Sequence, residues 1–526
     1  MAETSGPMAA FRHRTFTLLW VATVISNTGT WMNEVGAAWL MTTLDPSPAS
    51  VALVQAASTL PVFLFALLAG AIADLVDRRR MLLVVNLLML GVATGFALLV
   101  QAGQATVELL ILATFLLGTG AAFQAPAWQA IVPSLVPRAE LKSAIALNSM
   151  GINISRAIGP AVAGALIVGV GLAAPFALNA VSFVVILAAL FLWRSEPATT
   201  GALPKERIGP AIRAGLRYAL HSGPLKSALI RAAAFFVFAS AFWALLPLAT
   251  RQSLGGDATL YGILMGAVGF GAVAGALVMP KLRALLGADG MVTAGTLGTA
   301  AVLVILATVQ SQVAAVAAAL LAGLSWIAVL TTLNASAQTS LPGWVRARGL
   351  SIFITVFFGC MALGSLLWGQ VAEAIGIQTT FLVAAGGAIA LIPFVRGQAL
   401  GQAEAMDLTA SAHWPAPVVN LEDASERGPV MVLVEYPVDP AHRDAFLARL
   451  RDLGEARRRN GAYDWGVMEH VEDTGTVVEY FIEASWTDHL RHHDRVTGAD
   501  REIQEALAGY LVDGTSPRVI HLLAPG

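Results

Sequence analysis

Cysteine and charge are both scarce in this chain of 526 residues. Cys360 is the only cysteine, which excludes a disulfide framework and a cysteine-based metal site within one chain. Charged residues make up 13% of the sequence, about half of the roughly 25% that is usual in soluble globular proteins. Together with 56% hydrophobic residues and a mean hydropathy of +0.70, this composition indicates a polytopic membrane protein.

Two sequence signals are also missing. Met1–Arg14 has no cleavable signal pattern, and Phe16–Leu40 is too long for the apolar part of a signal peptide, so it is expected to be a first spanning helix. No Gly-x-x-x-x-Gly-Lys-Ser/Thr motif occurs, which excludes an ATP-driven engine of that kind. The formal net charge of −2 says little by itself; no nucleic-acid partner is expected.

Twelve apolar runs are present, most of them close to the ~20 residues that a helix needs to cross a bilayer. Several runs are longer than one crossing and are expected to tilt or protrude. The runs are Phe16–Leu40, Val51–Ala73, Met81–Val100, Val107–Val132, Leu141–Val170, Ala173–Trp193, Leu229–Arg251, Leu260–Met279, Met291–Val309, Val313–Leu333, Gly349–Ala374 and Thr379–Val395.

Lysine and arginine are unevenly distributed over the segments that join these runs. With the N-terminus inside, the inner segments hold nineteen of these residues and the outer loops hold one, Arg251. Because short cytoplasmic loops carry an excess of Lys and Arg, this asymmetry predicts that both termini are cytoplasmic. The expected location is therefore a cell (inner) membrane, with the chain as a multi-pass protein in the lipid bilayer.

Glycine and proline recur at a fixed offset of 205 residues, which points to two six-helix halves related by parallel duplication. Gly70, Gly118, Pro137, Gly159 and Gly164 recur as Gly275, Gly323, Pro342, Gly364 and Gly369. We predict the two halves over residues 1–193 and 227–396. The inner segment 194–226 joins them and includes a basic, partly helical stretch, Ile212–Leu220.

A short turn follows the second apolar run and carries five charges in seven residues, which cannot lie in hydrocarbon. Gly70, Asp74, Arg78 and Arg79 match the signature Gly-x-x-x-Asp-Arg-x-Gly-Arg-Arg/Lys, whereas Leu75 and Asp77 depart from it. The turn therefore resembles the loop between helices 2 and 3 of the major facilitator superfamily. Its Asp-Arg-Arg ending is similar to the branch of secretion effectors and siderophore exporters. A basic turn that serves only topology is the alternative.

The resemblance implies an all-α membrane fold of twelve helices in two halves that rock about a site at the midplane. It also implies a cytoplasmic latch, made by Gly70, Asp74, Asp77, Arg78 and Arg79, whose charges bond across the inner mouth. The second copy of the loop is degraded, because Met279 replaces Asp74 and Ala284 replaces Arg79.

Two ionisable residues lie well inside apolar runs, where a charge is costly and commonly functional. Glu34 shares a helical stripe with Asn27 and Thr30, which indicates a cavity or another helix rather than lipid. Arg156 is fifteen residues past Leu141, about 22 Å along its helix, and so near the midplane. We expect both residues in transport and proton coupling; a purely structural ion pair between them is the alternative.

Small residues surround Arg156 in the segment 155–164, which resembles the helix 5 motif Gly-x-x-x-Gly-Pro-x-x-Gly-Gly of superfamily antiporters. Small residues let helix backbones approach and proline bends the helix, so packing is the favoured role of Gly159, Pro160, Gly164, Gly364 and Gly369. Further polar residues of the apolar runs are cavity candidates or helix-to-helix contacts; they are Gln124, Gln129, Asn148, Asn153, Asn334 and Gln338.

After the last apolar run the composition changes. Residues 397–428 are rich in Ala, Pro, Gly and acidic residues and are expected to form a linker. Residues 429–526 follow a strand–helix–strand–strand–helix–strand pattern, with the second helical region as two helices, which predicts a ferredoxin-like α+β domain. The strand Val477–Trp486 and the His-rich helix after it resemble the dimeric α+β barrels of the antibiotic-biosynthesis monooxygenase type. This resemblance implies a dimer through the C-terminal domain as one alternative.

Histidine and tryptophan residues of this domain offer little evidence of chemistry by themselves. His489 and His493 have the i, i+4 spacing of metal ligands and flank His492, but no third ligand is evident, so an exposed polar helix face is preferred. Trp465, His470 and Trp486 are candidates to line a pocket or to form core. No catalytic residue, cofactor or metal is assigned.

The sequence thus predicts a secondary active transporter, not an enzyme, which exports a small organic molecule such as a drug or siderophore by proton antiport. The alternative is a membrane-anchored bifunctional protein whose C-terminal domain is a cofactor-free monooxygenase or a regulatory dimerisation module. The substrate, the direction of transport and the coupling ion are left open by the sequence.

Overall fold

The computed structural model describes residues 8–137, 140–193, 208–401, 403, 406–411, 413–414, 427–473 and 475–525. The first part of the predicted inter-half segment, residues 194–207, lies outside the described residues, as do linker residues 415–426. The chain forms two compact units. The first comprises Met1–Leu203, Ile230–Leu333 and Phe353–Gln398, and the second comprises Pro204–Leu229, Asn334–Ile352 and Ala399–Gly526.

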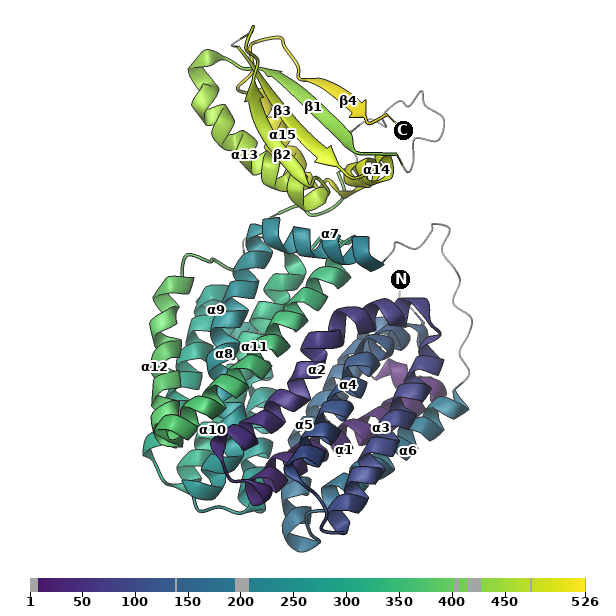
Figure 1. Cartoon of the computed structure of the whole chain (residues 1–526), viewed down its shortest axis with the longest axis vertical. Coiled ribbons are helices and arrows are strands. Elements are labelled where there is room, and N and C mark those ends of the chain that lie inside the picture. Colours follow the sequence, from purple (N-terminus) through teal and green to yellow (C-terminus); the bar gives the residue numbers. More distant parts are fainter. Residues whose placement is uncertain are drawn as a thin grey trace. The chain divides into compact units, whose positions relative to one another are not determined.

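Two groups of long helices make up most of the fold (Figure 1). The first group follows a short 3-10 helix, Ala9–Arg12, and consists of α1 (Arg14–Leu44), α2 (Pro48–Leu75), α3 (Arg78–Gln101), α4 (Val107–Ile131), α5 (Leu141–Gly169) and α6 (Ala174–Leu192). The second consists of α8 (Gly223–Gln252), α9 (Ala258–Thr308), α10 (Gln312–Thr339), α11 (Arg346–Ile375) and α12 (Ile377–Val395).

The predicted membrane spans are found as helices. Among the described residues, ten helices are long and apolar enough to cross a membrane. One of them, α9, has a non-helical residue at Gly287 (φ 65°), so it covers the two runs predicted as Leu260–Met279 and Met291–Val309. The more polar α1 lies outside those ten and matches the first predicted run. The chain is a mostly helical, multi-pass membrane protein.

Side-chain caps fix where several of these helices begin. Ser47, Asp77, Thr106 and Asp257 precede α2, α3, α4 and α9, and each accepts a hydrogen bond from a backbone N–H of the first turn. Such caps satisfy amide groups that have no partner within the helix. The sharp turns between the spans are therefore set locally, by residues that sit just outside the apolar runs.

The two groups of helices meet where glycine allows close approach. A Cβ added at Gly164 of α5 would lie 2.5 Å from the Ala258 carbonyl oxygen of α9. A Cβ added at Gly369 of α11 would lie 2.6 Å from the Cβ of Ala52 in α2. Both contacts lie toward the end of the helices that carries the α1–α2 turn, next to a large apolar cluster with members from both halves.

The second unit contains a four-stranded antiparallel sheet of order β2-β3-β1-β4. Its strands are β1 (Val430–Pro437), β2 (Asp464–Glu469), β3 (Thr476–Glu483) and β4 (Arg518–Leu523). The helices α13 (Arg443–Asn460), α14 (Trp486–Arg495) and α15 (Gly498–Ala508) complete it. This order and the element sequence are those of a ferredoxin-like fold, so the predicted α+β domain is confirmed.

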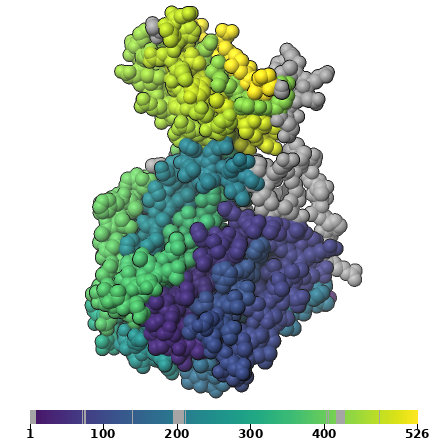
Figure 2. Space-filling model, in the orientation of Figure 1, coloured from purple at the N-terminus to yellow at the C-terminus, as the bar shows by residue number. Residues whose placement is uncertain are grey.

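Buried and half-buried side chains alternate along β1 and β3, so the sheet has a buried face and a more exposed face. Val430, Val432, Val434 and Tyr436 of β1 are buried and pack with Phe446 and Leu450 of α13. The edge strand β4, yellow in Figure 2, lies at the surface. The helix α7 (Ile208–His221) belongs to the same unit, and His221 lies 2.8 Å from the Glu455 carboxylate of α13.

Part of the segment that the sequence assigned to the linker contacts the folded domain. Ala410 forms an isolated antiparallel bridge with Thr497, and the backbone N–H of Ser411 donates to the Val496 carbonyl. The indole of Trp414 donates to the Gln504 side chain over 3.0 Å. These residues therefore extend the domain, because their backbone and side-chain polar groups find partners on α15 and just before it.

Candidate functional site

Glu34 and Arg156 come together between α1 and α5. Glu34 lies inside α1, two thirds of the way along the helix, and its side chain is exposed. It interacts electrostatically with Arg156 and also with Tyr261 of α9. The Arg156 guanidinium lies 5.0 Å from the ring centroid of Trp31. An acid, a base and a phenol from both halves of the transporter-like fold thus share one site.

Arg156 is incompletely bonded. Its Nε is buried and has no hydrogen-bond partner within the described part of the chain. The packing of α5, in contrast, is tight: Ser155 donates to the Val24 carbonyl over 2.9 Å, and a Cβ added at Gly159 would lie 2.7 Å from the Cβ of Trp31. The backbone of Arg156 is therefore held in place, while its guanidinium retains bonding capacity.

Tyr261 is a residue that sequence reasoning missed. It stacks on Trp39 of α1, with ring centroids 6.1 Å apart, and both rings are buried. The chain has only six tyrosines, and Tyr261 lies inside an apolar run. Its polar hydroxyl in that run could have marked it as a candidate site residue. Its position brings α9, from the second half, next to the Glu34 stripe of the first half.

The other cavity candidates have varied surroundings. The Trp128 indole donates to the Asn148 side chain over 3.1 Å and so joins α4 to α5. Asn153 donates to the Ser149 carbonyl of its own helix, and Thr30 to the Ser26 carbonyl. In the second unit, Gln338 donates to Asn334 within α10 over 2.8 Å. Asn27 and Gln124 are half-buried, and Gln129 is exposed.

Two charges of the predicted latch have structural partners. The Asp77 carboxylate accepts from the Arg80 backbone N–H over 2.7 Å and caps α3. Arg79 donates to the Leu190 and Phe191 carbonyls over 2.9 and 3.0 Å, where a cation complements the C-terminal end of α6. The side chain of Asp74 lies outside the described part, and a Cβ added at Gly70 would meet nothing within 4 Å.

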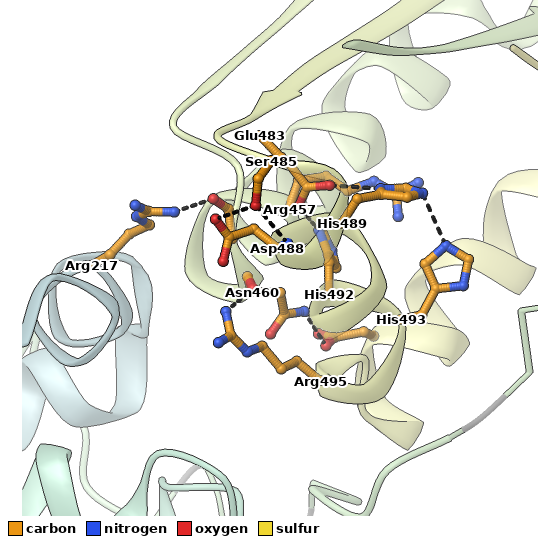
Figure 3. Close-up of polar contacts among 12 residues, drawn as sticks. Arg217, Arg457, Asn460, Glu483, Ser485, Asp488, His489, His492, His493 and Arg495 are labelled. Carbon is orange, nitrogen blue, oxygen red and sulfur yellow. Dashed lines mark hydrogen bonds and ion pairs between the residues drawn. The ribbon is translucent and has the colours of Figure 1, made fainter. Parts of the chain in front are cut away.

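The histidines of α14 differ from the sequence-based interpretation of an exposed polar face, which is wrong. His489 and His492 are each only 1% exposed, and both donate through Nδ1 to the buried carboxylate of Glu483, over 2.7 and 2.6 Å (Figure 3). A third candidate ligand beside His489 and His493 also exists: it is His521 on β4. The sequence could not show it, because β4 lies about thirty residues away and is brought near only by the sheet.

Charge in this domain is buried on one face of β3. Burial opposes ionisation of Glu483, but the neighbouring His492 and His489 lower its pKa to about 2. Glu479 accepts from Arg457 over 3.1 Å, from the Tyr436 hydroxyl over 2.9 Å and from the Trp465 indole over 2.9 Å.

The three residues proposed to line a pocket do not gather in one place. Trp465 bonds to Glu479, His470 is exposed beyond β2, and Trp486 is buried in the core. The narrow space beside His492 and Asp500 has no room for a water molecule and is therefore no ligand pocket, since such pockets begin at ~300 Å³.

This architecture, with two helical groups in contact through glycines and a charged site between them, defines a membrane transporter of the major facilitator type. The chain belongs to the transmembrane secretion effector family, whose profile matches residues 5–525. That match includes the C-terminal sheet domain as well as the helices.

Characterised relatives match about two thirds of the chain. A staphyloferrin A transporter of Staphylococcus aureus is 27% identical over 364 residues, which are 68% of this chain and 89% of the relative. A multidrug efflux pump, Tap, of Mycolicibacterium fortuitum is 24% identical over 69% of this chain and 91% of its own length.

Solved transporter structures share the fold. An auto-inhibited POT family peptide transporter superposes with a TM-score of 0.62 at 12% identity, covering 77% of this chain and 99% of its own. An inward-facing bacterial homologue of the human lysosomal transporter Spinster gives a TM-score of 0.57 at 16% identity, over 74% of this chain and 95% of its own. These similarities support the fold and leave the substrate open.

Proposed function

We propose that this transporter exports a small organic molecule by alternating access and is driven by proton antiport. The names of its relatives, a siderophore transporter and a multidrug efflux pump, support a substrate of drug or siderophore size. The observation that carries the proposal is the Glu34 site. A carboxylate at this depth is stabilised either by a proton or by a cationic partner, and it can exchange one for the other.

The position of this site between the halves supports the coupling. Glu34 and Arg156 belong to the first half and Tyr261 to the second, so a rocking movement of the halves changes the surroundings of the carboxylate. In this proposal Arg156 stabilises the ionised form of Glu34 in one state. Protonation of Glu34 then releases Arg156 to an anionic group of the substrate. The incomplete bonding of Arg156 fits such an exchange.

The proposed topology places both termini in the cytoplasm, in a cell (inner) membrane. It rests on the arginine and lysine asymmetry and agrees with the membership of α7 and the sheet domain in one compact unit. The glycine contacts of α5 with α9 and of α2 with α11 then lie on the outer side. They must separate when the transporter opens outward, while Asp74 and Arg78 of the latch form bonds on the inner side.

Export and coupling are tested together. An efflux-deficient host that expresses the chain is screened for survival against a panel of drugs and siderophores. A compound found in this way is then offered to inverted vesicles with an acidic interior, where the chain should drive its uptake. Uptake that continues unchanged after the pH gradient is collapsed would contradict proton antiport. If cells that express the chain survive no better than the empty host against every compound, export of this substrate class would be contradicted.

Topology is tested with single cysteines in a Cys360→Ser background. An impermeant maleimide added to intact cells should label Gln104→Cys, in the turn between α3 and α4, and should leave Asp513→Cys in the sheet domain unlabelled. Both positions are exposed, so access to the side chain is matched. Labelling of Asp513→Cys in intact cells would contradict the cytoplasmic C-terminal domain.

For the C-terminal domain we propose dimerisation rather than a monooxygenase reaction. The helices pack on one face of the sheet, and the register places apolar side chains on the other. These outer-face residues are Met431, Leu433, Val478, Tyr480, Ile482, Ile520, Leu522 and Met468, all of them half-buried or exposed. An open apolar sheet face is an aggregation hazard unless a partner covers it, and a second copy of the same face is self-complementary.

Charges placed on that face should break the dimer. The mass of the full chain in detergent, measured by native mass spectrometry, should fall from two copies to one in a Leu433→Glu/Ile520→Glu variant. Val471→Glu, which places the same charge at an exposed apolar position after β2 and outside that face, is the matched surface control and should stay dimeric. A monomeric wild type would contradict the dimer, and substrate-dependent oxygen consumption by the wild type would favour the monooxygenase alternative.

A further inference from the structure

Three imidazoles from two separate elements of the C-terminal domain converge. His489 and His493 lie one helical turn apart on α14, and His521 lies on the edge strand β4, opposite Val432 of β1. One ring nitrogen of each lies within 4.8 Å of the other two. The ring of His489 is 4.8 Å from that of His493 and 4.9 Å from that of His521, centroid to centroid.

The bonding of His489 directs a lone pair toward this point. Its Nδ1 donates to the Glu483 carboxylate over 2.7 Å, so its Nε2 is the unprotonated nitrogen of the neutral ring. That Nε2 lies 3.2 Å from the Nε2 of His493. A carboxylate behind a histidine in this way fixes the tautomer and the ring orientation of metal-ligating histidines and raises their basicity.

The spacing matches a tetrahedral metal centre. Zinc–nitrogen bonds of 2.0–2.1 Å at tetrahedral angles place two ligand nitrogens about 3.3 Å apart. The two Nε2 atoms of α14, at 3.2 Å, already have this separation. The nitrogen of His521, at no more than 4.8 Å, needs to approach by about 1.5 Å at most, which a turn of an exposed side chain on an edge strand can supply.

The aromatic neighbours of these rings restrict their orientation. Trp414 packs 4.8 Å from His493, and Trp486 packs 5.2 Å from His489, centroid to centroid, so the rings have little freedom to turn away. Metal ions bind the neutral form of imidazole through a ring nitrogen that carries no proton.

We propose that His489, His493 and His521 bind a divalent transition-metal ion of the zinc type. Three imidazoles suit Zn²⁺, Co²⁺, Ni²⁺ or Cu²⁺ and exclude hard cations such as Mg²⁺ and Ca²⁺, which prefer oxygen ligands. The exposed side of His521 leaves a fourth position open to solvent. A bound metal ion would link the edge strand β4 to the helix α14.

The experiment uses the full chain, purified in detergent without a polyhistidine tag and stripped with EDTA. Titration with ZnCl2 should give one site per chain, and CoCl2 should give the visible absorption of tetrahedral cobalt. Zinc affinity should fall at least tenfold in His521→Ala and in His493→Ala. An excess of MgCl2 should leave zinc binding unchanged. His470→Ala, which removes an exposed histidine of the same domain outside the cluster, should bind zinc as the wild type does.

Because His521 is exposed, His521→Ala should unfold at the same temperature as the wild type in EDTA, and only the wild type should gain stability from zinc. If His493→Ala does not fold, His521→Ala carries the test by itself. A wild type that takes up no zinc, or a folded His521→Ala that binds zinc as tightly as the wild type, would overturn the proposal. Either result would leave the 3.2 Å contact as an ordinary imidazole–imidazole hydrogen bond.

Discussion

Arg156 in the helical unit is half-buried and Arg457 in the sheet domain is buried; both lie over aromatic rings, yet their bonding differs. Arg457 pairs with Glu479 through Nε at 3.1 Å and Nη2 at 3.4 Å, and it lies 4.8 Å from the rings of both Trp414 and Phe481. Arg156 lies 5.0 Å from Trp31, and its Nε has no hydrogen-bond partner within the described residues.

The difference separates a charge that holds a fold from a charge that is available for exchange. A buried pair with satisfied hydrogen bonds has one stable arrangement, and the loss of one partner leaves the other uncompensated. An arginine with an unused donor has a second arrangement within reach. We therefore propose that the network of Arg457 is structural, whereas the site of Arg156 and Glu34 changes during transport.

The largest expected effect is on the stability of the sheet domain. Arg457→Ala should lower the free energy of unfolding of that domain by about 3–5 kcal/mol, because it leaves the Glu479 carboxylate buried and unpaired. Amide hydrogen exchange of β3 in the full chain measures this. Arg156→Ala should instead leave exchange in α5 nearly unchanged and reduce transport about tenfold or more, a loss of about 1.4 kcal/mol or more. Equal destabilisation by both substitutions would break the comparison.

Packing, rather than ion pairing, positions Arg156, and a methyl group should disturb it. In Gly269→Ala the new Cβ would lie 2.8 Å from the Ala157 Cα and 3.1 Å from the Arg156 carbonyl oxygen. Overpacking of this kind costs about 1–3 kcal/mol, so we expect a lower melting temperature in detergent and slower transport.

Gly91→Ala is the control for this substitution. A Cβ added there meets nothing within 4 Å, and alanine favours the helix by up to about 1 kcal/mol. Gly269→Ala with wild-type stability and transport would show that the tight α5–α9 contact has no role in placing Arg156.

The predicted latch also contains both kinds of charge, one that stabilises the fold and others that we expect to act in transport. Asp77 caps α3, so Asp77→Ala should cost about 1 kcal/mol of stability. Asp74→Asn and Arg78→Ala should instead impair transport several-fold and leave expression intact, because a two-state transporter needs both states within a few kcal/mol. Transport rates and expression levels in inverted vesicles separate the two effects. Wild-type transport by Asp74→Asn and Arg78→Ala together would reduce the turn to a topology signal.

A smaller effect is expected from pH on the sheet domain. Burial opposes ionisation of Asp500, but Arg459, Asn460 and the Thr497 backbone N–H outweigh it and hold the pKa of this carboxyl below its usual value of 3.8. A lowered folded pKa gives stability that is present above about pH 4 and is lost as the pH falls through the folded pKa.

Hydrogen exchange in α15 should therefore accelerate as the pH falls from 4 toward 2, beyond its intrinsic pH dependence. Asp500→Asn should flatten this response, whereas Asp513→Asn, at an exposed position, should keep it. An unchanged response in Asp500→Asn would remove Asp500 from the group of charges that hold the fold.

The sequence made the intramembrane charges visible because a carboxylate or guanidinium inside an apolar run has no ordinary explanation. Glu34 and Arg156 were found in this way. The long apolar runs predicted the spans, and the pattern of strands and helices predicted the sheet domain. The same argument fails for Arg457, Glu479 and Glu483, because charged residues are common in a water-exposed domain and their burial depends on the fold.

Contacts between segments that are distant in the sequence could not be predicted either, because they also depend on the fold. Tyr261 approaches Glu34 only because glycines let α9 pack on α5, and His521 approaches His489 only through the register of β4 on β1. Hydrophobic periodicity predicts which face of a helix or strand is buried, but not which residue of another element lies opposite. Ala410, Ser411 and Trp414 were assigned to the linker because the stretch around them is rich in Ala, Pro, Gly and acidic residues, although they find partners on the domain.

Proton coupling through Glu34 is the central claim, and uptake into inverted vesicles under an imposed pH gradient measures it most directly. Glu34→Gln should still bind the transported compound but should lose gradient-driven uptake, because the amide cannot exchange a proton for Arg156. Glu108→Gln, which neutralises an exposed carboxylate in the first turn of α4, should keep both. Full gradient-driven uptake by Glu34→Gln would contradict the account and remove Glu34 from the mechanism.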